Sequence, residues 1–377
     1  MRHRHPRSAS LTAVAGLLAW TVLLASCPFP APGAATDAMA CSAKSQELLQ
    51  TVAAIIEPGK GILAADESTG TAGKRLASVG LPNTEDNRRA LREMLFAAPG
   101  FEKHISGVIL YEETLFQESS SGGRLVDALT EQGVVLGIKV DIGTVPLPGS
   151  PFELYTQGLD GLRQRCDKYY AAGARFAKWR AVIPIDAPSG LPSALGVQSA
   201  AEGLAKYARI CQDAGLVPIV EPEVLSDGAH SLEACEAVTT RVLSAVFREL
   251  LAHGVELEAM LLKPNMVLPG ASARPAPPAA VAAATRRVLR RTVPPAVPGV
   301  LFLSGGQTEG EATEHLRLIN ELGSNPWYVS FSYGRALQAS ALKAWSGKPG
   351  NVKAGQAQLL QRAAANGAAA LARPAAA

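Results

Sequence analysis

The 377-residue chain lacks the patterns that mark several common classes of protein. Its 36 basic and 33 acidic residues nearly balance, so no charge excess favours nucleic acid as a partner. The five cysteines show no CxxC spacing and their number is odd, which argues against a disulfide framework. The six histidines are scattered, and no HExxH or HxxxH pair outside the first forty residues predicts a zinc site. The sequence therefore predicts a protein that binds neither metal nor nucleic acid.

Acidic residues are also absent before Asp37, and residues 1–40 have the pattern of a targeting leader. Three arginines in the first seven residues precede an apolar run of 15 residues, from Leu11 to Ala25, which is short for a membrane span. Small residues follow, as at a cleavage site. We predict a leader that directs the protein to the plastid (chloroplast stroma). The secretory pathway and an uncleaved anchor are the alternatives, and no stable membrane association is expected after leader removal.

After the leader, apolar runs typical of buried strands alternate with helical patterns. The eight strand-like runs are Gly61–Asp66, Gly107–Tyr111, Val134–Asp141, Arg175–Val182, Leu216–Val224, Ala259–Val267, Val300–Leu303 and Tyr328–Tyr333. Eight strands separated by helices favour a parallel sheet closed into a (β/α)8 TIM barrel, over residues 41–350. An open doubly wound sheet is the rival, but no GxGxxG motif follows a strand. Residues 351–377 are alanine-rich, which predicts a C-terminal helix and tail.

Charged residues stand near the carboxyl ends of most of these runs. In a (β/α)8 barrel those ends meet at one face, where catalytic residues lie. Residues two apart on a strand point to the same side, and three successive runs carry such pairs: Lys139 with Asp141, Lys178 with Arg180, and Glu221 with Glu223. Asp66 ends the first run and Lys263 lies in the sixth. Any one of these pairs could lie on a solvent-exposed strand edge. Together they predict a charged opening, the mouth of the barrel, at the face where the carboxyl ends of the strands meet.

Lys263 lies in an apolar run, where a charged amine is costly unless it is paired or deprotonated. A desolvated lysine attacks a ketone and forms a Schiff base. The ordinary alternative is a lysine that extends its amine to water. A nearby cation such as Lys178 would disfavour protonation of Lys263. Three carboxylates are the candidates for proton transfer as an imine forms and a carbon–carbon bond breaks: Asp66, Glu221 and Glu223.

Two further groups of residues are suited to binding phosphate. The first lies at the ends of the last two runs, Ser304-Gly305-Gly306 and Ser332-Tyr333-Gly334-Arg335, where the N–H groups of Gly305 and Gly306 and the guanidinium of Arg335 can hold one phosphate. The second would lie across the mouth and comprises Ser68, Lys74, Arg75 and Lys139. The predicted ligand is a phosphorylated keto compound, with phosphate at one or both ends.

Several longer runs resemble class I fructose-1,6-bisphosphate aldolases. They are GKGILAADEST (59–69), GIKVD (137–141), TQGLDGL (156–162), FAKWR (176–180), VPIVEPE (217–223), LLKPNMV (261–267), RRTVPPAVPG (290–299), FLSGGQ (302–307) and SFSYGRALQASALKAW (330–345). The resemblance spans about residues 45 to 353. Details such as Asn325-Pro326-Trp327 resemble the plastid branch of the family.

The resemblance implies reversible cleavage of fructose 1,6-bisphosphate into dihydroxyacetone phosphate and glyceraldehyde 3-phosphate, with no metal or other cofactor. It implies that Lys263 forms the Schiff base and that Glu221 is the main proton donor and acceptor. Asp66 would handle the proton of the C4 hydroxyl, and Lys178 and Glu223 would support imine formation. Phosphorylated ketoses and trioses are the expected partners, and a homotetramer is the expected assembly.

The resemblance also divides the substrate-binding residues between two ends of the substrate. Ser304, Gly305, Gly306, Ser332 and Arg335 would bind one phosphate, and Ser68, Arg75, Lys139 and Arg180 would line the other end. Two features depart from the family pattern: no tyrosine follows Tyr333, where the family has a terminal tyrosine that assists proton transfer, and Ile142 replaces a frequent lysine. The alternatives to an active aldolase of glycolysis, gluconeogenesis or the Calvin cycle are a catalytically weak scaffold or binding protein and a transaldolase-like enzyme.

Overall fold

The computed structural model describes residues 32–374, and side chains from Ala43 onward. The chain divides into two units, Met1–Cys41 and Ser42–Ala377. Most of the predicted leader therefore lies outside the described residues, although the first helix, α1 (Pro32–Ile55), begins within it. None of the described helices has the length and apolar character to cross a membrane.

Eight parallel strands of the second unit close into a barrel in the order β1-β10-β9-β8-β7-β6-β3-β2. They are β1 (Gly61–Ala65), β2 (Ile105–Leu110), β3 (Val135–Lys139), β6 (Phe176–Ile183), β7 (Val217–Val224), β8 (Leu261–Leu262), β9 (Gly299–Phe302) and β10 (Tyr328–Tyr333). This closed order confirms the predicted (β/α)8 TIM barrel and excludes the open sheet. Each strand corresponds to one of the eight apolar runs.

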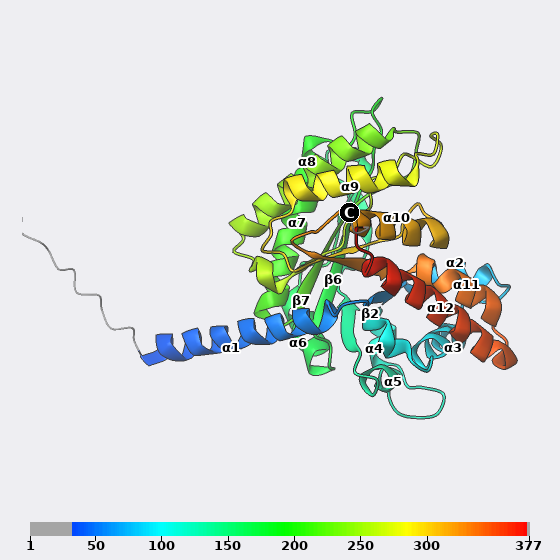
Figure 1. Cartoon of the computed structure of the whole chain (residues 1–377). Helices are drawn as coiled ribbons and strands as arrows, with labels where there is room; N and C mark the ends of the chain where they lie inside the picture. Colours follow the sequence, from blue (N-terminus) through cyan, green and yellow to red (C-terminus); the bar gives the residue numbers. More distant parts are fainter. Residues whose placement is uncertain (1–31, 375–377) are drawn as a thin grey trace, which may run out of the picture. The chain divides into compact units, whose positions relative to one another are not determined.

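Helices cover the outside of the barrel (Figure 1). They are α2 (Thr69–Ala77), α3 (Glu85–Phe96), α4 (Glu112–Phe116), α5 (Asp127–Thr130), α6 (Leu162–Ala171), α7 (Ala194–Asp213), α8 (Leu232–Ala252), α9 (Pro278–Thr292), α10 (Glu309–Glu321), α11 (Arg335–Trp345) and α12 (Val352–Ala370). Side-chain oxygens of Thr84, Ser193, Ser231 and Thr308 accept hydrogen bonds from the first turns of α3, α7, α8 and α10. These caps satisfy backbone donors that have no partner within the helix, so they fix where each helix begins.

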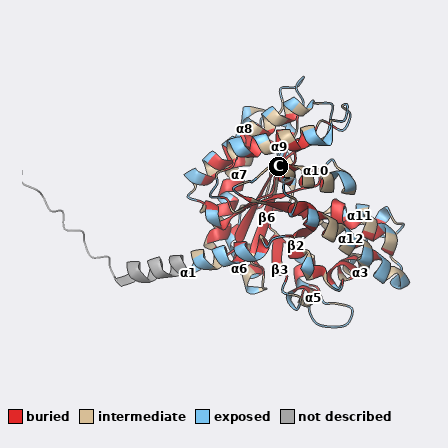
Figure 2. Ribbon diagram, in the orientation of Figure 1, coloured by how far each residue is buried: buried red, intermediate tan, exposed pale blue. Residues whose placement is uncertain are grey.

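The interior of the barrel contains apolar side chains, and Leu48, Val52 and Ile55 from the last part of α1 pack against it at the end opposite the strands' carboxyl ends. Figure 2 shows the buried strands at the centre of the ribbon. Leu48, Val52 and Ile55 of α1 pack in the same cluster as Ile62 and Phe176. The Phe176 ring occupies the space that a side chain at Gly137 would need. Only the face at the carboxyl ends of the strands therefore remains open.

Two details of the barrel differ from the predicted elements. β8 contains only Leu261 and Leu262, whereas the apolar run suggested Ala259–Val267. Pro264 has no N–H group, so it cannot donate to a strand ladder and the regular pairing ends before it. A two-stranded antiparallel hairpin, β4 (Thr144–Leu147) and β5 (Ser150–Thr156), also lies outside the barrel between β3 and α6. The sequence analysis did not predict this hairpin.

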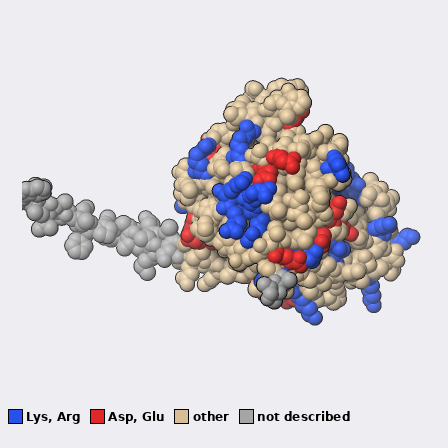
Figure 3. Space-filling model, turned by 45° about the horizontal axis from the view of Figure 1, so that its top comes forward, with Lys and Arg blue, Asp and Glu red and all other residues tan. Residues whose placement is uncertain are grey.

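Ion pairs between helices contribute to the outer surface. Arg287 and Arg291 of α9 both reach Glu236 of α8, with N–O distances of 2.6 and 3.2 Å. Figure 3 shows Lys and Arg gathered on one face with Asp and Glu beside them. Exposed pairs of this kind are worth little individually, because water screens them.

Candidate active site

A cavity of about 590 Å³ opens at the carboxyl ends of the barrel strands. Its lining contains the predicted catalytic residues Asp66, Lys178, Glu221, Glu223 and Lys263. It also contains the predicted substrate-binding residues Ser68, Arg75, Lys139, Arg180, Ser304, Ser332, Arg335, Gly305 and Gly334. The strand ends thus bring together side chains that are up to 269 positions apart in sequence, from Asp66 to Arg335.

Lys263 follows β8 directly and is buried, with 4% of its surface exposed. Its backbone N–H donates to the carbonyl of Val220 on β7 at 2.8 Å, which fixes the residue against the neighbouring strand. Its Nζ lies 3.3 Å from Oε1 of Glu221. A lysine that extends into water is therefore excluded, because the amine points to a carboxylate inside the cavity.

Lys178 of β6 connects two carboxylates. Its Nζ lies 2.7 Å from Oδ2 of Asp66 and 3.4 Å from Oε2 of Glu221. Burial lowers the pKa of Lys178, but the negative charges of Asp66 and Glu221 oppose this effect and hold its pKa above the ordinary value. Burial raises the pKa of Asp66, but Lys178 and Lys263 outweigh it and hold the pKa below the ordinary value. Lys178 is therefore the permanently charged lysine of the site.

Glu221 has an oxygen that no hydrogen bond satisfies. Oε2 is buried, and it lacks a hydrogen-bond partner among the described residues although the amine of Lys178 lies 3.4 Å away. A buried carboxylate oxygen without a hydrogen bond is costly unless it is used. Glu221 therefore keeps an open acceptor on the oxygen that faces Lys178, while its Oε1 faces Lys263, and a carboxylate in this state can take up a proton.

Glu223 was expected to support imine formation at Lys263, but its ion-pair partner is a different residue. Glu223 pairs with the Nε of Arg180, and no described ion pair joins it to Lys263. Its Oε1 also lies against Gly305, where an added Cβ would approach it to 2.8 Å. Glu223 thus borders Arg180 and the Gly305 turn.

Asp141 belongs to the site; its spacing from Lys139 placed it in the predicted charged mouth, but no catalytic or binding role was predicted for it. It is buried, its Oδ1 lies 2.6 Å from the Nζ of Lys139, and its Oδ2 accepts from the backbone N–H of Arg180 at 3.4 Å. The carboxylate therefore orients two of the cations predicted to bind substrate. The spacing of Lys139 and Asp141 on one strand was the signal that could have identified it.

Arg75 lies next to the turn after β10. The sequence analysis had placed it in the second phosphate-binding set, across the mouth from that turn. Its guanidinium bonds Oε1 of Gln338 at 3.0 Å and pairs with Oε1 of Glu67 at 2.5 Å. A Cβ added to Gly334 would lie 3.3 Å from Nη2 of Arg75. The two sets of residues predicted to bind phosphate are therefore adjacent at this point, because β1 pairs with β10 in the closed barrel.

Two of the residues predicted to bind phosphate do not line the cavity. Gly306 has a φ of 75°, and a Cβ there would overlap the side chain of Ser226. It therefore shapes the turn, since only glycine tolerates both constraints. Lys74 is exposed on α2 and does not belong to the lining. In contrast, Ser332 is 1% exposed and its hydroxyl has no partner in the described structure, so it is available to a ligand.

The residues described in the structure contain no cluster of three or more His, Cys, Asp or Glu side chains arranged to hold a metal ion. The cavity instead offers amines, guanidiniums, hydroxyls and carboxylates. A buried lysine beside a carboxylate with an open acceptor, at the mouth of a (β/α)8 barrel, defines a Schiff-base lyase. Comparison with known proteins makes the class specific.

Residues 47–376 match the family model described as Fructose-bisphosphate aldolase class-I, and the chain belongs to this family. It is 59% identical over 326 residues to the cytoplasmic isozyme of fructose-bisphosphate aldolase from Cicer arietinum, covering 86% of this chain and 90% of that protein. It is 57% identical over 328 residues to the cytosolic fructose-bisphosphate aldolase 6 of Arabidopsis thaliana, covering 87% and 91%.

A solved structure agrees with these relatives. Fructose-bisphosphate aldolase from Plasmodium falciparum, crystallised with TRAP and a small-molecule inhibitor, matches with a TM-score of 0.87 and 52% identity. The match covers 89% of this chain and 96% of that one. The predicted activity is confirmed: the enzyme is a fructose-bisphosphate aldolase, and a role in glycolysis or gluconeogenesis fits.

The predicted destination is wrong. The plant relatives at 57–59% identity are cytosolic or cytoplasmic isozymes, which contradicts both the plastid localisation and the resemblance to a plastid branch. The error has a clear cause. The basic and apolar residues that suggested a plastid leader precede residue 47, where the family match begins, so they carry no information about which isozyme the barrel resembles.

Proposed function

We propose that Lys263 is the residue that forms the Schiff base with the C2 ketone of fructose 1,6-bisphosphate. The observation that carries this proposal is the burial of Lys263, 4% exposed, with its amine 3.3 Å from Glu221 and facing the cavity. Attack on a ketone requires a neutral amine. The carboxylate of Glu221 is near enough to take the proton that Lys263 loses, while Lys178 keeps its own charge.

Further proton transfers are assigned to the same carboxylates. After the amine adds to C2, Glu221 protonates the departing hydroxyl of the carbinolamine, and water leaves to form the iminium. Asp66 then removes the proton of the C4 hydroxyl. The C3–C4 bond breaks, its electron pair moves into the iminium to give an enamine, and glyceraldehyde 3-phosphate departs. Asp66 returns its proton to solvent, and Glu221 takes up a proton from solvent and delivers it to C3 of the enamine, which restores the iminium. Water then hydrolyses the iminium and releases dihydroxyacetone phosphate and Lys263.

The charged groups at the mouth supply the substrate-binding side of the proposal. Ser304, Gly305, Ser332, Gly334 and Arg335 are proposed to hold the phosphate nearest Lys263. Ser68, Arg75, Lys139 and Arg180 are proposed to line the other end of the substrate. Their support is that all nine line one cavity with the lysine. Backbone N–H groups and guanidiniums are also the donors that phosphate prefers.

Borohydride trapping tests the role of Lys263. The full chain is mixed with dihydroxyacetone phosphate and reduced, and the modified peptide is identified by mass spectrometry. The expected result is a stable adduct on Lys263, absent after Lys263→Arg. Lys206→Arg is the matched control, because Lys206 is an exposed lysine of α7 paired with Glu202. An adduct on another lysine, with Lys263 unmodified, would refute the assignment.

We also propose that the chain assembles as a homotetramer. The proposal derives from the family resemblance and is supported by exposed apolar side chains, including Phe152 at 74% and Leu251 at 60%, which contacts between copies would cover. Light scattering coupled to size-exclusion chromatography measures the mass directly. A mass of about one chain, 39.3 kDa, would contradict the proposal.

A further inference from the structure

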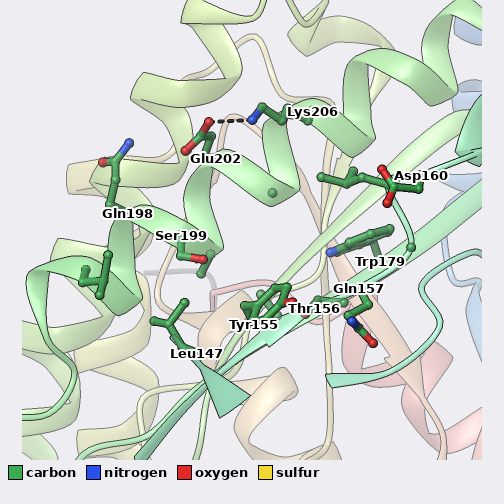
Figure 4. Close-up of a pocket in the computed structure, with 16 residues that line it drawn as sticks. Leu147, Tyr155, Thr156, Gln157, Asp160, Trp179, Gln198, Ser199, Glu202 and Lys206 are labelled. Carbon is green, nitrogen blue, oxygen red and sulfur yellow. Dashed lines mark hydrogen bonds and ion pairs between the residues drawn. The ribbon is translucent and has the colours of Figure 1, made fainter. Parts of the chain in front are cut away.

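Lys178 is held in place by the strand on which it lies. It pairs with Lys139 on β3 and with Ile219 on β7. Its neighbour Trp179 points to the other side of β6 and stacks on Tyr207 of α7, with ring centroids 5.4 Å apart. Figure 4 shows the Trp179 ring among side chains of α7 and the β4–β5 hairpin. Neighbouring strands and outer packing thus fix the position of this lysine.

Asp66, by contrast, lies beyond the last paired residue of β1. That strand ends at Ala65 and α2 begins at Thr69, so residues 66–68 form a loop that is neither strand nor helix. Two residues of this loop are assigned to the reaction: Asp66 removes the proton of the C4 hydroxyl, and Ser68 binds substrate. Contacts from elsewhere in the fold must therefore hold the loop in position.

Arg92 of α3 contacts the middle of this loop. Its Nη2 donates to the backbone carbonyl of Glu67 at 2.8 Å. The side chain is buried, with 3% of its surface exposed, which is unusual for arginine. A hydrogen bond from a charged donor is also roughly twice as strong as one between neutral groups. The guanidinium therefore anchors the carbonyl that lies between Asp66 and Ser68.

The other contacts of Arg92 do not explain why it is buried. Its Nη1 lies 3.8 Å from Oε2 of Glu113, too far for a hydrogen bond, and has no hydrogen-bond partner among the described residues. Glu113 is held instead by Arg88, whose Nε and Nη2 donate to it at 2.9 and 2.8 Å. An incompletely paired buried charge is costly, so a contribution to stability alone does not account for Arg92.

The side chain of Glu67 continues the connection to a substrate-binding group. Its Oε1 pairs with Nη1 of Arg75 at 2.5 Å and accepts from Nε2 of Gln338 at 3.2 Å. Gln338 is buried and also donates to the carbonyl of Ala64 in β1 at 2.7 Å. A shift of the Glu67 backbone would therefore move Asp66 and the carboxylate that holds Arg75.

We propose that Arg92 is a positioning residue for cleavage of the carbon–carbon bond, because it fixes the loop that carries Asp66. The inference rests on the role of Asp66 in the proposed function. Arg92 does not line the active-site cavity, so it acts only through the loop. It affects the step that needs Asp66 and leaves the steps performed by Lys263 and Glu221 unchanged.

Two reactions of the same enzyme separate these steps. Cleavage of fructose 1,6-bisphosphate requires Asp66 to take the proton of the C4 hydroxyl. Dihydroxyacetone phosphate has no C4 hydroxyl, and its iminium on Lys263 exchanges a C3 hydrogen with deuterium oxide when Glu221 removes a proton and returns a deuteron. The ratio of the cleavage rate to the exchange rate, both at saturating substrate, does not depend on how much of the preparation is folded.

Arg92→Met is the main variant, because methionine fills irregular apolar space and removes both the charge and the donor. Glu113 keeps its pair with Arg88, so no carboxylate is left unpaired on α4. We expect the ratio of cleavage to exchange to fall about 10- to 100-fold, as a small displacement of a catalytic group would cause, with the exchange rate nearly unchanged. Arg92→Lys keeps a charged donor but not the planar fork, so it should restore the ratio only in part.

Arg89 supplies the matched control on the same helix. It pairs at 2.9 Å with Asp86, whose side chain is 79% exposed, so Arg89→Met should have the ratio of wild type. A ratio equal to wild type in both Arg92 variants would overturn the proposal, whether the two rates stay constant or fall together. If Arg92→Met does not fold, Arg92→Lys decides alone, and a wild-type ratio there would overturn the proposal.

Asp66→Asn keeps this test separate from that of the proposed function. A normal ratio of cleavage to exchange in Asp66→Asn would contradict the role proposed for Asp66 itself. A lowered ratio in Asp66→Asn together with a normal ratio in Arg92→Met would contradict only the positioning role of Arg92. A lowered ratio in both variants, with a normal ratio in Arg89→Met, is the result that we expect.

Discussion

The amine of Lys263 lies 3.3 Å from Oε1 of Glu221. The other oxygen of that carboxylate lies 3.4 Å from the amine of Lys178. Glu221 therefore stands between a lysine proposed to become neutral and a lysine whose pKa is held above the ordinary value by Asp66 and Glu221 itself. This arrangement lets a proton move between Lys263 and Glu221 while the charge of Lys178 stays constant.

Glu221→Gln should separate proton transfer from substrate binding. The amide has nearly the shape of the carboxylate but cannot accept the proton of Lys263, so we expect kcat to fall about 10²- to 10⁴-fold with a small change in KM. Steady-state kinetics measure both. Glu202→Gln, which removes an exposed carboxylate of α7, should leave both constants unchanged. A Glu221→Gln enzyme with kcat near wild type would exclude Glu221 as the main proton donor and acceptor.

Asp66→Asn should reduce stability in a pH-dependent way. Burial raises the pKa of Asp66, but Lys178 and Lys263 outweigh this effect and hold the pKa below the ordinary value of 3.8. A carboxylate with a lowered folded-state pKa stabilises the protein above its unfolded-state pKa, and that contribution is lost as pH falls through the folded-state pKa. Removing one partner of a buried pair costs about 3–5 kcal/mol. We therefore expect a constant loss at neutral pH that diminishes below about pH 3.8.

Unfolding midpoints measured from neutral to acidic pH test this expectation for Asp66. Asp167→Asn is the control, because Asp167 forms an exposed pair with Arg163, and both side chains are about half exposed. That variant should differ little from wild type at any pH. A stability difference for Asp66→Asn that grows as the solution becomes more acidic would contradict the lowered pKa.

Gly305→Ala should weaken substrate binding. The new Cβ would approach Oε1 of Glu223 to 2.8 Å and the side chain of Leu303 to 3.1 Å, so the turn must shift. A lost hydrogen bond to a charged group costs about 1.5–3 kcal/mol, which corresponds to about a tenfold or greater rise in KM. Gly310→Ala should bind normally, because its Cβ enters open space. Equal KM values for the two variants would exclude Gly305 from the phosphate site.

Much of the barrel could be predicted because strand ends carry a local signal. Lys178 and Glu221 lie on strands of eight residues that are mostly apolar, so their charged side chains stood out as candidates for the mouth of the barrel. The position of Gly306 outside the cavity lining could not be predicted, because a Ser-Gly-Gly sequence shows neither φ nor which N–H groups face the cavity. Arg75 contacts Glu67 and Gln338, which lie 8 and 263 positions away from it in the sequence. No sequence pattern predicted these contacts.

The β4–β5 hairpin escaped prediction for a related reason. Its segments carry exposed apolar residues such as Phe152, so they lack the clear alternation of a half-buried strand. The ion pair between Glu223 and Arg180 could not be predicted either. The spacing of Glu223 from Glu221 placed both side chains on one side of β7, but the pairing of β7 with β6, which brings Arg180 beside Glu223, is not visible in the sequence.

Arg165→Gln should raise KM more than it lowers kcat. Arg165 is a positioning residue: its guanidinium joins the carbonyls of Val140 and Asp160, and its buried Nε lacks a partner among the described residues. Without it the segment that carries Lys139 and Asp141 would be less fixed, and a small displacement of binding groups costs roughly tenfold or more. Lysine has no planar fork of donors, so Arg165→Lys should restore the KM only in part.

Arg163 supplies the matched control for Arg165 on the same helix. Its guanidinium pairs with Asp167 at 2.9 Å on the exposed surface, so Arg163→Gln should leave kinetics and melting temperature unchanged. A purely structural role for Arg165 would lower the melting temperature and the amount of active enzyme while KM stayed constant. The positioning role predicts the opposite pattern, in which the folded variant keeps a near-normal kcat but requires more substrate. An Arg165→Gln enzyme with the KM of Arg163→Gln would show that Arg165 does not position the substrate-binding residues.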